Sequence, residues 1–139
     1  MNNISYEQIK VDHVEEFSFS VTEKHMEMFL QITKDENPLH CDEKYAKERG
    51  FEQKVVYGML TASFLSTLAG VYLPGKKSLI HAVSIEMVKP VYVGENLVCE
   101  AVVVEKNDLF KAIVVKYSIK NNLGEKKLRG KMRIGVLDD

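Results

Sequence analysis

The segment from Gly58 to Tyr72 restricts the possible folds of this chain more than any other part of it. Its pattern predicts a helix that is apolar almost all round, which is typical of a helix buried in a core. Small residues recur along this segment at spacings that place them on one face. They are Ala62, Ser63, Ser66, Ala69 and Gly70. We therefore expect a buried helix, whose small residues let it approach a sheet or a ligand closely.

Strand patterns follow this helix through to the end of the sequence. The predicted strands span residues 78–89, 95–105, 109–120 and 125–136. Turn signals separate them at residues 93–95, 106–108 and 121–124. In the last strand, apolar residues alternate with the basic residues Lys127, Arg129, Lys131 and Arg133. We interpret this basic row as a solvent-exposed strand face, with a nucleotide-phosphate site as the alternative.

Upstream of the central helix, the pattern predicts one strand and two further helices. Residues 16–21 alternate with period two, which predicts a strand, and residues 23–33 predict an amphipathic helix. Pro38 disfavours helical angles at the residue before it, so residues 35–38 are predicted to form a turn. A short charged helix over residues 43–49 follows this turn.

This order of elements predicts an α+β fold in which one long helix lies against a single antiparallel sheet. The length of 139 residues fits a single domain that spans residues 1–139. The apolar face of such a sheet is covered by one helix, and its edges are open. Dimerisation by edge pairing or by docking on the helix side is therefore expected.

The charge and composition exclude several classes of function. The net charge is −1, so nothing in the bulk charge favours nucleic acid or an anionic membrane surface as a partner. The longest apolar run, residues 58–73, is shorter than the roughly 20 residues that a membrane span needs. Two cysteines without CxxC spacing predict free thiols in a reducing compartment. The N-terminus lacks a signal-peptide pattern, so a cytoplasmic protein is expected.

The stretch from Asp35 to His40 is the strongest candidate for chemistry. It places a carboxylate and an imidazole five residues apart, with Asn37 and Pro38 between them. Proline restricts the backbone, and Asn37 can fix it by hydrogen bonding, which is the preorganisation that an acid/base site needs. Such a pair is suited to activating a water molecule for hydration, dehydration or hydrolysis. The alternative is structural: the acid closes a turn and His40 caps the next helix.

Gly58 is a second candidate because it begins the central helix. Its N–H would lie at the positive end of a buried helix, where it could bind a carbonyl oxygen that becomes negative during a reaction. A thioester carbonyl fits this role; the alternative is simply a helix start without a side chain. The four histidines share no metal-ligand spacing, and no GxGxxG or P-loop motif is present. We therefore predict no metal and no cofactor.

These motifs resemble those of a known family. The sequence Asp35-Glu36-Asn37-Pro38-Leu39-His40 resembles the D-x-N-P-x-H signature of the MaoC-like dehydratases, also called (R)-specific enoyl-CoA hydratases. The stretch Val55-Val56-Tyr57-Gly58-Met59-Leu60 is similar to the family's V-x-H-G-M-L segment. Residues 89–95 resemble its P-V-x-x-G-D/E turn, and Leu73-Pro74-Gly75 matches its Leu-Pro-Gly turn.

The resemblance implies a hot-dog fold, with a long central helix wrapped by an antiparallel β-sheet, and a homodimer. It implies reversible syn addition of water to a trans-2-enoyl thioester of CoA or acyl-carrier protein, giving the (R)-3-hydroxyacyl product. On this reading Asp35 and His40 hold the catalytic water, and the Gly58 N–H binds the thioester carbonyl. Ser66, or less directly its neighbour Ser63, would line the site. Asn37 and Tyr57 complete the predicted set of substrate-binding residues.

One departure from the family pattern concerns Tyr57, which stands where the family usually has histidine. Tyrosine has a polar tip but titrates near pH 10. If the histidine of the family only orders the pocket, Tyr57 can replace it. If the histidine tunes the acid, activity or substrate choice will differ in this chain.

Two other functions remain as alternatives at this level. One is a hot-dog acyl-CoA thioesterase, which would use the same carbonyl donor at Gly58 but attack the carbonyl carbon. The other is a non-catalytic acyl-thioester binding protein, in which Asp35 and His40 no longer act on substrate.

Overall fold

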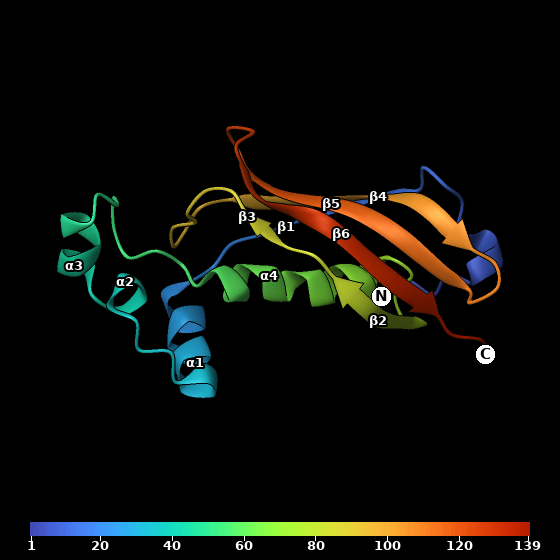
Figure 1. Ribbon diagram of the computed structural model, residues 1–139, viewed down its shortest axis with the longest axis horizontal. Helices are drawn as coiled ribbons and strands as arrows, with labels where there is room; N and C mark the ends of the chain where they lie inside the picture. The colour runs from blue at the N-terminus through green and yellow to red at the C-terminus, as the bar shows by residue number, and fades with distance from the viewer.

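The computed structural model describes residues 1–139 and consists of one curved sheet with a helix along its inner side. Figure 1 shows the sheet arching over α4, while α1, α2 and α3 lie beyond the N-terminal end of that helix. The helices are α1 (Glu23–Thr33), α2 (Pro38–Cys41), α3 (Glu43–Glu48) and α4 (Gly58–Thr67), with a 3-10 turn at Tyr6–Gln8 and a π-helical continuation of α4 at Leu68–Tyr72. The strands are β1 (Val14–Phe19), β2 (Ser78–Val83), β3 (Glu86–Met87), β4 (Leu97–Asn107), β5 (Ala112–Asn121) and β6 (Lys126–Val136).

The sheet has the order β1-β4-β5-β6-β2, and β3 pairs with the first part of β6. Every pairing is antiparallel. This confirms the predicted α+β architecture of one long helix against a single antiparallel sheet. None of the helices combines the length and the apolar character that crossing a membrane would require.

The core forms where the apolar side of α4 meets the inward face of the sheet. Leu60, Leu65 and Leu68 of the helical segment belong to the same buried cluster as Ile113 and Val115 of β5. Side chains in β5 alternate in burial because successive residues of a strand point to opposite faces. Each fully buried aliphatic side chain contributes about 1.5–3 kcal/mol to folding, so this contact dominates the stability.

The helix before the candidate site forms where the sequence predicts it. The Thr22 hydroxyl accepts a hydrogen bond from the His25 N–H and caps α1. Lys34 ends the helix in the left-handed conformation, with φ of 58°. Asp42 caps α3 in the same way by accepting from the Tyr45 N–H. These local hydrogen bonds explain why the bounds 23–33 are correct and why α3 lies within the predicted residues 43–49.

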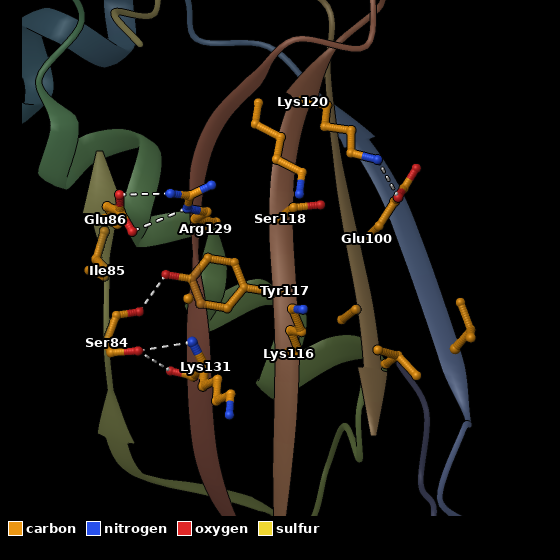
Figure 2. A pocket seen from close by; sticks show the side chains of 15 residues that line it. Ser84, Ile85, Glu86, Glu100, Lys116, Tyr117, Ser118, Lys120, Arg129 and Lys131 are labelled. Carbon is orange, nitrogen blue, oxygen red and sulfur yellow. Dashed lines mark hydrogen bonds and ion pairs between the residues drawn. The ribbon is translucent and has the colours of Figure 1, made fainter. Parts of the chain in front are cut away.

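The predicted strand over residues 78–89 is broken into β2 and β3 at Ser84 and Ile85. The Tyr117 side chain crosses β6 above Gly130, and its hydroxyl donates to the Ser84 carbonyl oxygen at 2.7 Å (Figure 2). The Ser84 hydroxyl also accepts from the Lys131 N–H at 3.0 Å. The side chains of Tyr117 and Ser84 thus replace part of the regular ladder, which no alternation pattern reveals.

The hairpin between β4 and β5 turns later than predicted. β4 continues to Asn107, and the turn occupies residues 108–111, where we expected the next strand to have begun. The Asn107 side chain accepts from the Phe110 N–H at 3.0 Å and closes the turn. Leu109 and Phe110 are 84% and 71% exposed, so two apolar residues that favoured a strand lie at the hairpin tip.

Lys127 does not belong to a solvated basic row. The β5–β6 register shifts between Ile119 and Lys120, and Lys127 is buried, being only 5% exposed. Its ammonium group donates to the Pro90 carbonyl oxygen at 2.9 Å and pairs with Glu95 at 3.1 Å. The prediction of an exposed side chain is therefore wrong for Lys127, because the register shift turns it inward.

The prediction of a buried central helix is correct for only one side of α4 in the single chain. Figure 1 shows the sheet on one side of α4 only. Ala62 and Ala69 are buried, whereas Ser63 and Ser66 are exposed and Met59 is 59% exposed. The row of small residues therefore straddles the boundary between the covered and the uncovered side.

Gly130 provides a test of the packing between β6 and the β2–β3 break. A Cβ at this position would lie 2.0 Å from the Ser84 carbonyl oxygen, which is backbone and cannot move away easily. We expect Gly130→Ala to lower the free energy of unfolding by about 1–3 kcal/mol, the usual cost of overpacking. Chemical denaturation measures this change.

Gly70→Ala is the matched control, because a Cβ there would meet only the Ser78 hydroxyl, at 3.9 Å. It should leave the stability unchanged or raise it slightly. Equal effects of the two substitutions would show that the contact at Gly130 is unimportant.

Candidate active site

The candidate site begins in the segment that joins α1 to α2. Asp35 follows Lys34 directly, and its Oδ1 atom accepts a hydrogen bond from the Asn37 N–H at 3.1 Å. The Asp35 N–H in turn donates to the Thr33 hydroxyl at 3.2 Å. One carboxylate oxygen therefore fixes the turn, and the other has no protein partner and can accept from a ligand.

His40 lies on α2, a one-turn helix that the sequence pattern did not predict. Pro38 occupies the first turn, and the Asn37 side chain accepts from the Leu39 N–H at 3.0 Å. Asn37 thus acts as the helix cap, as its type and position favour. The side-chain oxygen of Asn37 is therefore used to cap α2.

The His40 ring is held in one orientation by a backbone carbonyl. Its Nδ1 lies 2.6 Å from the Val55 carbonyl oxygen. Because a carbonyl oxygen can only accept, Nδ1 carries the proton of this hydrogen bond. In the neutral ring, Nε2 is then unprotonated and free to accept a proton from a bound water molecule.

Tyr57 connects Asp35 and His40. Its hydroxyl donates to the Asp35 carbonyl oxygen at 2.8 Å, and its ring stacks on His40 with centroids 4.3 Å apart. Phe29 packs on the ring at 4.7 Å, and the Cys41 thiol contacts the hydroxyl at 3.5 Å. The side chain is only 3% exposed. The structure therefore places the predicted Tyr57 in contact with both Asp35 and His40.

The electrostatic environment keeps the Tyr57 hydroxyl neutral. Burial raises the pKa of its phenol above the ordinary value of 10.0, and the hydrogen bond with Cys41 raises the pKa further. A phenol with a raised pKa does not exchange protons near neutral pH. The Tyr57 phenol is therefore neutral while it contacts Asp35 and His40.

Gly58, at the N-terminus of α4, lines the same cavity as His40. Gly58 is the first residue of this helix and follows Tyr57 directly, so its N–H has no acceptor within the helix. No backbone or side-chain group elsewhere accepts from it. A Cβ at Gly58 would lie 2.4 Å from the Met87 sulfur, so the glycine also lets β3 approach the start of the helix.

A cavity of about 360 Å³ brings His40 and Gly58 together. Its walls are mainly apolar and come from α2, the start of α4, β3 and the segment that follows β3. The lining includes Phe51, Thr61, Met87, Val91 and Leu128. The sequence pattern did not single out Thr61 or Met87, although a threonine one helical turn after Gly58 is a signal that could have found the first. Asp35 lies outside the lining and is linked to it through Tyr57.

The structure does not bring the two predicted serines into this cavity. The Ser63 hydroxyl donates to the Leu60 carbonyl oxygen of its own helix at 2.6 Å. Ser63 and Ser66 both lie on the exposed side of α4. Within one chain, these serines and the Asp35–His40 pair therefore form separate groups.

A larger hollow of about 790 Å³ lies on the polar face of the sheet (Figure 2). Its cations are partly paired: Arg129 binds both carboxylate oxygens of Glu86, and Lys120 pairs with Glu100 at 3.2 Å. None of the predicted site residues lines it. With Arg129 paired and Lys127 buried, the alternative of a nucleotide-phosphate site on this strand loses two of its four cations.

No group of three or more His, Cys, Asp or Glu side chains that could hold a metal ion occurs in the structure.

Comparison with known proteins identifies the family. The family model described as MaoC like domain matches residues 7–123. The chain belongs to the MaoC-like domain family. This confirms the family that the D-x-N-P-x-H resemblance indicated.

Two solved structures show the same hot-dog fold. The unliganded R-hydratase from Pseudomonas aeruginosa superposes with a TM-score of 0.91 at 26% identity, covering 99% of this chain and 88% of that one. The (R)-hydratase from Aeromonas caviae gives a TM-score of 0.88 at 28% identity, with 94% and 98% covered. The predicted fold class is therefore confirmed.

A curated relative, the (R)-specific enoyl-CoA hydratase of Aeromonas caviae, is 42% identical to this chain over 72 residues. That alignment covers 52% of this MaoC-like chain and 54% of the relative, so the chain spans about half the length of the curated protein it matches.

The raised pKa of Tyr57 predicts how stability depends on pH. Folding favours the neutral phenol, so its contribution is fully present below the unfolded pKa near 10 and is lost as the pH rises toward the higher folded value. We expect the free energy of unfolding to fall above pH 10, and to fall less steeply in Tyr57→Phe. At neutral pH this variant should lose about 0.5–1.5 kcal/mol with its hydrogen bond.

Denaturation between pH 7 and pH 11 measures both effects. Tyr72→Phe is the control, because the Tyr72 hydroxyl makes no hydrogen bond with another group of the chain, although its ring is stacked on Phe17. A Tyr57→Phe variant with the wild-type alkaline slope would contradict the prediction.

Proposed function

We propose that this MaoC-like chain is an (R)-specific enoyl-thioester hydratase, or 3-hydroxyacyl-thioester dehydratase in the reverse direction. One observation carries the proposal. Tyr57 contacts both Asp35 and His40 and directly precedes Gly58, whose N–H is free. Two proton acceptors, and one N–H that can donate to a carbonyl oxygen, are thereby held at the start of one helix.

The two acceptors can hold a water molecule between them. One O–H of the water donates to the free oxygen of Asp35 and the other to Nε2 of His40, so a lone pair of the water is left for attack on C3 of the enoyl group. The thioester carbonyl oxygen binds the Gly58 N–H and takes the negative charge as the enolate forms. The C3–O bond forms, the C2–C3 π bond breaks, and the group that took the water's proton returns a proton to C2.

This arrangement also explains the stereochemistry of the reaction. The group that takes the water's proton lies on the same side of the substrate as the water, so returning the proton to C2 from there gives syn addition. The atoms balance without an external oxidant, metal or cofactor. The apolar walls of the cavity suit an acyl chain.

Relatives support this assignment over its alternatives. Curated relatives are named (R)-specific enoyl-CoA hydratase and 3-hydroxyacyl-[acyl-carrier-protein] dehydratase. The substrate is accordingly a thioester of CoA or of acyl-carrier protein, which both present the same pantetheine arm. A thioesterase would use the same carbonyl donor but release a free thiol, and a binding protein would do neither reaction.

The decisive test of this proposal is loss of enoyl-thioester absorbance with crotonyl-CoA and longer enoyl-CoAs. Asp35→Asn and His40→Ala should each lower kcat by roughly 10²- to 10⁴-fold, the usual contribution of a positioned acid or base. The double variant should lose little more, because both groups act on one water. Asp42→Asn is the matched control, since Asp42 caps α3 and lies outside the cavity.

Near-additive losses would contradict the shared water. Thiol release by the wild type without loss of the double bond would favour the thioesterase, and binding without turnover would favour the non-catalytic alternative.

We also propose that two copies of the chain form a homodimer, in which each copy covers the side of the other's α4 that the sheet leaves exposed. β2 pairs with β6 along one edge, and its other edge has no partner strand. Leu79, Ile80 and Val83 of β2 are 51%, 38% and 40% exposed. Met59 of α4 and Met87 of β3 are exposed to a similar extent. A second copy would bury this apolar surface, together with the side of α4 that carries Ser63 and Ser66.

Charges on β2 test this arrangement. We expect Ile80→Lys combined with Val83→Lys to convert the dimer into a monomer, because edge lysines block strand pairing. Sedimentation velocity measures the mass. Leu109→Lys, at the exposed hairpin tip, is the control and should leave the dimer intact. A wild type that sediments as a monomer at micromolar concentration would refute the homodimer.

A cytoplasmic location completes the proposal. Cys41 is an exposed free thiol beside the site, and Cys99 is buried without a disulfide partner. Proteins with such thiols are typical of reducing compartments.

A further inference from the structure

Thr61 is the one buried polar side chain of the structure whose hydrogen-bonding capacity is unused. It is 0% exposed, and its Oγ1 atom has no hydrogen-bond partner. Burying a hydroxyl without a partner is unfavourable, and most buried polar groups in folded proteins are paired. The residue lines the cavity that also contains His40 and Gly58.

Thr61 lies about one helical turn after Gly58, whose N–H is free, and both residues line the same cavity. The two residues are three apart, so they share a face of the helix. Helical side chains lean toward the N-terminus and cover the preceding turn, which here has no side chain at Gly58. The Thr61 N–H is already bonded to the Tyr57 carbonyl oxygen at 3.2 Å, so the hydroxyl is the group that remains for a ligand.

Another helical threonine in the same chain shows the usual alternative. The Thr33 hydroxyl donates to the Phe29 carbonyl oxygen, four residues earlier, at 2.8 Å. Thr61 makes no such bond. Packing alone does not require its hydroxyl, because a valine would fill the same space with a methyl group.

We propose that the Thr61 hydroxyl is a second donor to the thioester carbonyl oxygen, beside the Gly58 N–H. The inference rests on the proposed hydration at this site and names a further residue for it. An enolate oxygen has lone pairs for two donors, and a donor in a mainly apolar cavity stabilises developing charge more strongly than one in water. The hydroxyl proton rotates freely until the oxygen arrives, so the donor is ready without a change in the backbone.

The first test compares Thr61→Val, which keeps the shape but removes the hydroxyl, with Thr61→Ser, which keeps the hydroxyl. We expect Thr61→Val to lower kcat for crotonyl-CoA hydration by roughly 10²- to 10³-fold with a much smaller change in KM. Thr61→Ser should stay within about tenfold of the wild type. The Tm of Thr61→Val should equal or exceed that of the wild type, because an unpaired buried hydroxyl is removed.

A second test separates this inference from the proposed function. Infrared difference spectra of bound butyryl-CoA with ¹³C at the carbonyl report hydrogen bonding to that oxygen and need no turnover. The carbonyl frequency should rise in Thr61→Val and remain at the wild-type value in Thr61→Ser. Thr61→Ala gives the same comparison if Thr61→Val does not fold.

The two tests separate a failure of the proposed function from a failure of the role inferred for Thr61. A wild type that binds thioesters without hydrating them would refute the proposed function, while the carbonyl frequency would still decide the role of Thr61. Unchanged kcat and unchanged frequency in Thr61→Val would overturn the inference and leave the hydratase intact. A wild type that binds no thioester would overturn both.

Discussion

The burial of one apolar helix against one sheet is the constraint on which the other features of this MaoC-like chain depend. A single curved sheet can cover only one side of α4, because its strands pass along the helix rather than around it (Figure 1). The covered side supplies the core. The uncovered side, where Ser63 and Ser66 lie, is the side on which we propose that a second copy docks. The helix start, where backbone N–H groups have no internal acceptors, is where we propose that the thioester carbonyl binds.

Tyr57 connects this helix to the reactive groups. The segment from α1 to α2 is exposed and has few apolar contacts of its own, so a precise acid/base pair cannot be held there by burial. A buried aromatic ring against His40, and a hydroxyl on the Asp35 backbone, transfer the rigidity of the core to this segment. Because burial raises the pKa of its phenol, Tyr57 makes these contacts as a neutral group.

The buried polar side chains of the structure have hydrogen-bond partners, with the single exception of Thr61. Lys127 is paired with Glu95 and with a backbone carbonyl, and Tyr117 reaches the Ser84 carbonyl across β6. These contacts fix irregular parts of the sheet and leave no free partner behind. Thr61 alone remains unpaired, and it is also the one that lines the candidate site. The unfavourable burial of a polar group without a hydrogen-bond partner is therefore confined to Thr61, where we propose that a substrate oxygen supplies the partner.

The sequence by itself determined the helix and strand order, the α+β class, the family and the identity of Asp35, His40 and Gly58 as candidates. These features depend on local periodicity, capping and short motifs, which are properties of neighbouring residues. The tertiary structure decided what depends on distant residues: the break after β2, the inward turn of Lys127, the exposure of Ser66, the role of Tyr57 and the unpaired hydroxyl of Thr61. Partners far apart in the sequence set these features, because burial and hydrogen bonding are completed only when the sheet closes over the helix.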